Sequence, residues 1–88
     1  MVSNVVLTGY LKERVEKDKS FRIIEWKENE VITNRVNVNK VPILFWTREE
    51  NNPLNRFAND THVVIKGRIE ESEKIGLYVL VEEVLLVR

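Results

Sequence analysis

The chain has 88 residues, of which 43% are hydrophobic and 32% charged, so it is long enough for one small globular domain and too apolar to be disordered. It contains no cysteine, which excludes a disulfide framework, a thiolate zinc site and a thiol nucleophile. Fourteen basic and fourteen acidic residues cancel to a net charge of zero, whereas a domain that holds phosphate backbones usually has a basic excess.

Two strands are predicted in the first 26 residues. Asn4–Leu11 alternates as a strand, and Gly9 within it marks a bulge or a bend where a sheet curls into a barrel. Lys12–Lys19 alternates in charge and is interpreted as a solvated hairpin connection. Ser20–Trp26 is rich in β-branched and aromatic residues, which favours a second strand.

The third strand is predicted around the only run of six residues without a polar side chain, Val41–Trp46. Before it, Glu30–Ile32 and Val36–Asn39 are interpreted as two arms of an extended hairpin with its turn at residues 33–35, and the second arm runs into the apolar segment. Pro42 cannot donate to a ladder, so we expect it at a bulge or on an edge, with Ile43 and Phe45 facing inward.

A short helix is predicted next. Asn52-Pro53 supplies an N-cap and a proline at the first helical position, and the apolar residues Leu54, Phe57 and Ala58 follow at helical spacing. A helix of this length is not stable alone, so we expect its apolar stripe to cover an apolar opening elsewhere in the fold.

Two further strands complete the chain. His62–Ile69 alternates cleanly, and Leu77–Val87 is apolar on both faces except at Glu82 and Glu83. A small protein rarely buries both faces of an antiparallel strand internally, so the last strand predicts self-association as a homodimer or homotetramer.

Five strands with a helix after the third form the layout of the OB-fold, a partly open barrel. Four segments in order, Asn4–Leu11, Val41–Trp46, His62–Ile69 and Leu77–Leu86, resemble strands of the bacterial single-stranded-DNA-binding proteins, a group that includes the primosomal accessory protein PriB. The resemblance implies one all-β OB-fold domain over residues 1–88, with a five-stranded barrel and one short helix between strands 3 and 4. It also implies non-catalytic binding of single-stranded DNA, or of RNA, in replication, recombination or repair.

The sequence departs from that family in two places. The family usually carries a flexible acidic tail that recruits repair enzymes, whereas this sequence ends on Leu-Leu-Val-Arg, so we expect a short, tail-less member without a recruiting role. The connection between strands 4 and 5 is short, and it contains Glu70, Glu71 and Glu73, which would repel a phosphate backbone.

Sequence-tolerant binding of single strands needs flat rings that stack on bases and cations that follow the phosphates. Tyr10 is a weaker ring candidate, while both tryptophans and several cations on predicted outward faces form the nucleic-acid-binding set: Arg22, Trp26, Arg35, Lys40, Trp46, Lys66 and Arg68. The alternatives are that the tryptophans belong to the core or a subunit interface and that each cation is a solvated surface charge.

An enzyme is a second class of function to consider. His62 is the only histidine, neighbouring carboxylates in a strand point to opposite faces, and no glycine-rich phosphate loop is present. We therefore expect no catalysis, no metal and no cofactor.

The third class is an OB module that binds a protein or only itself. The zero net charge, the acidic connection between the last two strands, and a last strand that is apolar on both faces all favour it. With no leader sequence and no apolar run of membrane-spanning length, we expect a cytoplasmic protein without a membrane partner.

Overall fold

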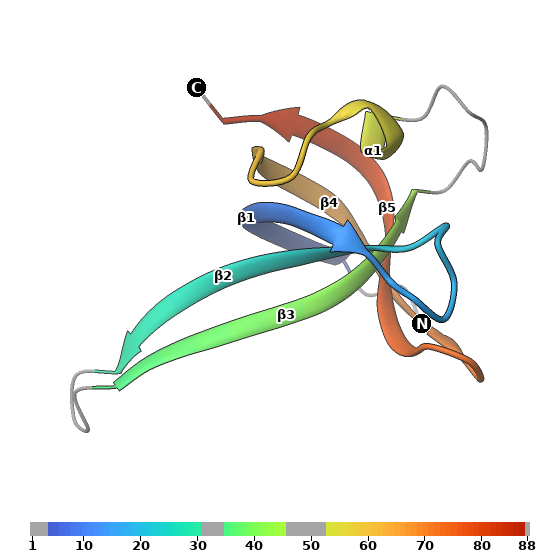
Figure 1. Cartoon of the computed structure of the whole chain (residues 1–88), viewed down its shortest axis with the longest axis horizontal. Helices are drawn as coiled ribbons and strands as arrows, with labels where there is room; N and C mark the ends of the chain where they lie inside the picture. Colours follow the sequence, from blue (N-terminus) through green and yellow to red (C-terminus); the bar gives the residue numbers. More distant parts are fainter. Residues whose placement is uncertain (1–3, 31–34, 46–52, 88) are drawn as a thin grey trace.

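The computed structural model describes residues 4–30, 35–45 and 53–87 (Figure 1). Its elements are β1 (Asn4–Arg14), β2 (Arg22–Glu30), β3 (Arg35–Phe45), α1 (Pro53–Arg56), β4 (His62–Ser72) and β5 (Gly76–Leu86). The strands form a closed barrel in the order β1-β2-β3-β5-β4, which confirms the predicted all-β OB-fold architecture. Among these residues, no helix is both long enough and apolar enough to cross a membrane.

Strand β1 is shared between two neighbours. It pairs with β4 over Asn4–Tyr10 and with β2 over Tyr10–Arg14, so the change of partner falls beside Gly9. A Cβ atom at Gly9 would lie 2.7 Å from the carbonyl oxygen of Glu25, closer than real side chains come to backbone. Glycine therefore permits the close approach of β1 to β2, in agreement with the bend expected from the sequence.

Strands β2 and β3 form a hairpin that extends beyond the barrel (Figure 1). Their pairing runs from Arg22 opposite Ile43 to Glu30 opposite Arg35, whereas β3 pairs with β5 only over Ile43–Phe45. Pro42 lies just before that second pairing begins, on an edge of β3, as expected for a residue without an N–H donor. The predicted turn at 33–35 lies outside the described residues except for Arg35.

The core lies inside the barrel and consists of alternate residues from every strand, with Leu54 of α1 at one end. Ile43 is fully buried and Phe45 packs against this cluster, as predicted. The helix is shorter than the apolar stripe suggested, since it ends at Arg56, yet Phe57 still packs on the core. Two residues of the predicted apolar stripe, Leu54 and Phe57, therefore contact the core, whereas the third, Ala58, is exposed.

Strand β4 is longer than the alternation predicted, whereas β5 has the predicted length and begins and ends one residue earlier; the two pair from Val63–Leu86 to Ser72–Gly76. Opposite Lys66 and Gly67 the register shifts, so that Glu82 is the extra residue of a bulge. Several large apolar side chains of β5 and the residue after it are exposed: Leu77 (66%), Leu85 (51%), Leu86 (48%) and Val87 (38%).

Candidate functional site

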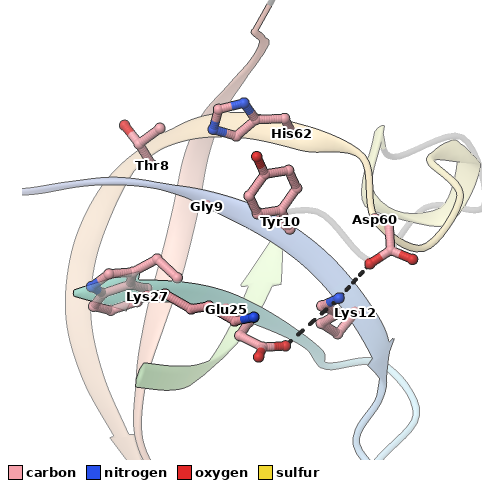
Figure 2. Close-up of a pocket in the computed structure, with 9 residues that line it drawn as sticks. Thr8, Gly9, Tyr10, Lys12, Glu25, Lys27, Asp60 and His62 are labelled. Atoms are coloured by element: carbon pink, nitrogen blue, oxygen red, sulfur yellow. Dashed lines mark hydrogen bonds and ion pairs between the residues drawn. The ribbon is translucent and has the colours of Figure 1, made fainter. Parts of the chain in front are cut away.

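The candidate site is a cavity of about 630 Å³ beside the point where β1 changes its pairing partner between β4 and β2 (Figure 2). This volume lies within the range of small-molecule sites in proteins. The cavity is lined by Thr8, Gly9, Tyr10, Lys12, Glu25, Trp26, Lys27, Asp60 and His62.

Two rings from neighbouring strands form one wall. Tyr10 of β1 and His62 of β4 are register partners, and their rings stack with centroids 4.4 Å apart and planes 16° apart. Figure 2 shows His62 beside the Tyr10 ring, and Tyr10 remains 45% exposed. Stacking restricts both rings, so the site offers a preformed aromatic surface to a ligand.

Trp26 is a third ring at the cavity and also contributes to the fold. It packs against the core cluster, and its Nε1–H donates to Oε1 of Glu28 at 3.2 Å. Trp26 is also one of the residues that line the cavity. The two interpretations of Trp26, core residue and ligand contact, are therefore compatible in this geometry.

Lys12 is held between two carboxylates. Its Nζ donates to Asp60 and lies 3.7 Å from Oε2 of Glu25 (Figure 2). The hydrogen bond to Asp60 raises the pKa of Lys12, with desolvation acting in the opposite direction. Asp60 has a positive φ of 71°, and its N–H donates to the carbonyl of Leu11 at 2.6 Å, which fixes the turn that carries the carboxylate. Lys27, by contrast, is an exposed cation at the cavity.

The structure contradicts the predicted role of Arg22 as a phosphate contact. Its side chain is only 4% exposed, and its guanidinium donates to the carbonyls of Leu54, Phe57 and Lys12 and to Oδ1 of Asn59. Burial, and next the charge of Arg14, lowers the pKa of Arg22. The residue is a structural cation that fixes α1 and the segment after it, because its donors satisfy carbonyls that a helix end leaves without partners.

The other predicted cations do not converge on the cavity. Lys66 and Arg68 are exposed on β4, where Lys66 lies 4.0 Å from Glu83 and Arg68 lies 3.2 Å from Glu70. They follow His62 by four and six residues, which is about 14 and 20 Å along a strand. Lys40 is exposed opposite Glu25 and lines a different cavity. The side chain of Arg35 and all of Trp46 lie outside the described residues.

The sequence pattern does not reveal most of the cavity. His62, Tyr10, Glu25 and Lys40 form one cross-strand row through four strands, β4, β1, β2 and β3. Alternation alone could not identify this row, because it depends on the register between strands far apart in sequence. Within the ranges that the structure describes, no group of three or more potential metal-ligating side chains is found.

No protein-family model and no curated protein sequence matches the chain. Solved structures do match, among them the crystal structure of a small single-stranded DNA-binding protein from Streptomyces coelicolor. That similarity covers 99% of this chain and 94% of the other, with a TM-score of 0.63 at 10% sequence identity. At this identity the likeness shows a shared fold.

Proposed function

We propose that this protein binds single-stranded DNA without catalysis, in DNA replication, recombination or repair. The observation that carries the proposal is the convergence of Tyr10, His62 and Trp26 on one cavity, with Lys27 at the same place. Stacking contributes roughly 1–3 kcal/mol per base and tolerates any sequence, because every base has a π-face. The shared fold with a protein that binds single-stranded DNA supports the same conclusion.

The charges around the cavity indicate that stacking outweighs phosphate contacts. Lys12 is already paired with two carboxylates, and Arg22 is buried in internal hydrogen bonds. Lys27 and Lys40 are exposed and stand on the two strands of the hairpin. A strand of DNA would therefore place its bases in the cavity and a small number of phosphates along this hairpin.

A titration with a fluorescein-labelled oligonucleotide of mixed base composition at low salt tests the proposal. We expect the anisotropy to rise and the tryptophan emission to fall, and we expect Tyr10→Ala to weaken the complex about 5- to 150-fold, the equivalent of one lost stack. Val6→Ala serves as the control, because Val6 is exposed on β1 and does not line the cavity. Unchanged anisotropy and unchanged emission at low salt would eliminate the proposal.

The second candidate function is a self-associating or protein-binding OB module, and the exposed apolar residues of β5 favour it. Leu77, Leu85 and Leu86 are each about half exposed or more, which is unusual for leucine in a strand of a small monomer. Self-association through this strand is compatible with DNA binding, because these residues do not line the cavity. A solution mass measured with and without the oligonucleotide distinguishes the two functions.

A further inference from the structure

The carboxylate of Glu25 is the unusual group in the cavity. Its side chain is only 17% exposed, and the Nζ of Lys12 lies 3.7 Å from Oε2, beyond hydrogen-bond distance. Within the described part of the chain, no side chain is found donating a hydrogen bond to this carboxylate. A carboxylate has about four acceptor positions, and Glu25 lines the cavity, so this group can accept hydrogen bonds from a ligand there.

The position of Glu25 suits a ligand that lies on the rings. Glu25 is the register partner of Tyr10 and lines the same cavity, so a flat group stacked on the free face of the Tyr10 ring lies beside the carboxylate. Figure 2 shows Glu25 and Lys12 together on the side of Tyr10 that faces away from His62. The cavity thus combines a stacking surface with an acceptor at its margin.

The charge balance disfavours a phosphate in the same position. Two cations, Lys12 and Lys27, and two carboxylates, Glu25 and Asp60, line the cavity. Lys12 contacts both carboxylates, so its charge is largely neutralised, and a phosphate beside Glu25 would be repelled. The group that fits is an uncharged ring that carries N–H donors on its edge.

We propose that Glu25 makes this cavity selective for bases with amino groups on their Watson–Crick edge, and for guanine above the others. The inference rests on the proposed function, since it concerns which base the same cavity accepts. Guanine presents N1–H and N2–H side by side, so the two oxygens of one carboxylate can accept both, and hydrogen bonds to a charged acceptor are the stronger kind. Cytosine and adenine offer one amino group each, and acceptance from the cytosine amino group by Glu or Asp is a known mode of readout.

Thymine is the base that the site should accept least well. Its single N3–H lies between two carbonyl oxygens, and both carbonyls would face the carboxylate. Asp60 is a poorer candidate for the same selection, because its side chain is 71% exposed and already accepts the hydrogen bond from Lys12. An acceptor in water discriminates less than one that is partly desolvated.

Three oligonucleotides of equal length test the inference: an all-thymidine strand, the same strand with one central guanine, and the same strand with hypoxanthine in place of that guanine. We expect the guanine strand to bind about fivefold or more tightly than the thymidine strand, the lower limit for one well-made bidentate contact. Hypoxanthine lacks the N2 amino group, so it should lose most of this gain. The comparison requires no change in the protein.

The Glu25→Gln variant then assigns the preference, with Glu83→Gln as the control because Glu83 is exposed on β5, away from the cavity. We expect Glu25→Gln to remove the preference for guanine, and Glu83→Gln to keep it. Equal affinity for all three strands overturns the inference and leaves the proposed function standing. The assignment to Glu25 is wrong if the preference for guanine persists in Glu25→Gln. It is also wrong if Asp60→Asn removes that preference instead. If none of the strands binds, the proposed function fails as well.

Discussion

The guanidinium of Arg22 donates to the carbonyl oxygen of Leu54 over 2.7 Å, so a buried cation of β2 fixes α1 against the barrel. The same side chain reaches Phe57, Asn59 and Lys12, and it therefore connects two strands with the segment that closes one end of the core. The last residue of this network, Asn59, directly precedes Asp60 and lies three residues before His62. The network therefore helps to position two residues that line the cavity.

Replacing Arg22 by Met should destabilise the fold by about 2–4 kcal/mol, because one buried and two partly buried carbonyls lose their donor. Arg22→Lys should recover only part of this loss, since an ammonium group cannot reproduce a planar fork of donors. Urea unfolding followed by circular dichroism measures both. Arg68→Met is the matched control, and because Arg68 is exposed we expect a change within about 0.5 kcal/mol. Equal stabilities of the two Met variants would disprove the structural role.

Lys12 makes stability depend on pH in the alkaline range. Its pKa is raised above the ordinary 10.5 by the hydrogen bond to Asp60, so the folded protein holds this proton more tightly than the unfolded chain does. The contribution is complete below the unfolded pKa and is lost as the pH rises through the folded pKa. We expect wild-type stability to fall more steeply above pH 10.5 than that of Lys12→Met, as measured by thermal unfolding at a series of pH values. Parallel curves for the two proteins would contradict the prediction.

Gly67 limits the distance between β4 and β5. A Cβ atom there would overlap the carbonyl oxygen of Leu80, and that neighbour is backbone, which cannot move aside by a rotamer change. We expect Gly67→Ala to cost about 1–3 kcal/mol through overpacking or a shift of the bulge.

Gly76 is the comparison, because no described atom lies within 4 Å of the position that a Cβ would occupy there. Gly76→Ala should therefore cost only the strain of its positive φ, about 1–2 kcal/mol. Differential scanning calorimetry of both variants measures which of the two substitutions lowers the stability more.

The strand pattern is predictable because alternation follows directly from the sequence. The strands expected over residues 4–11 and 62–69 lie within β1 and β4. The predicted strands end too early where backbone pairing continues beyond the hydrophobic alternation. The acidic composition of Glu70 and Glu71 indicates a turn, yet each pairs with a residue of β5, since a ladder that has begun continues as long as both backbones have partners.

The site is less predictable than the strands, and Arg22 shows why. The sequence correctly places Arg22, Ile24 and Trp26 on one face of β2, but the cation on that face wrongly suggests that it points to solvent. Alternation tells which residues share a face and not which face is buried. The Arg22 guanidinium is stable inside the protein because two carbonyl oxygens, 32 and 35 residues later in the chain, accept hydrogen bonds from it. No local sequence pattern contains that information.

The salt dependence of DNA binding separates cations that contact phosphate from those that do not. Each phosphate that the protein neutralises on a single strand contributes about −0.7 to the slope of log K against log salt concentration. We expect Lys27→Ala to make the slope shallower by about this amount, because Lys27 is exposed at the cavity. Arg68→Ala should leave the slope unchanged, since Arg68 pairs with Glu70 on β4. Titrations at several salt concentrations give the slopes, and a larger effect of Arg68 would move the phosphate path onto β4.

Self-association through β5 is tested at Leu85, which is 51% exposed and lies opposite Val64 in the ladder. If this face is covered by a second copy, Leu85→Glu places a charge in the interface and should reduce the solution mass to that of a single 10.4 kDa chain. The variant should unfold at nearly the same urea concentration under conditions where both proteins are monomeric, because an exposed position carries little folding energy. Lys17→Glu, in the exposed connection before β2, controls for the added negative charge. A wild-type mass of 10.4 kDa by sedimentation equilibrium, at every concentration measured, would exclude the interface and leave the exposed leucines as a surface for another protein.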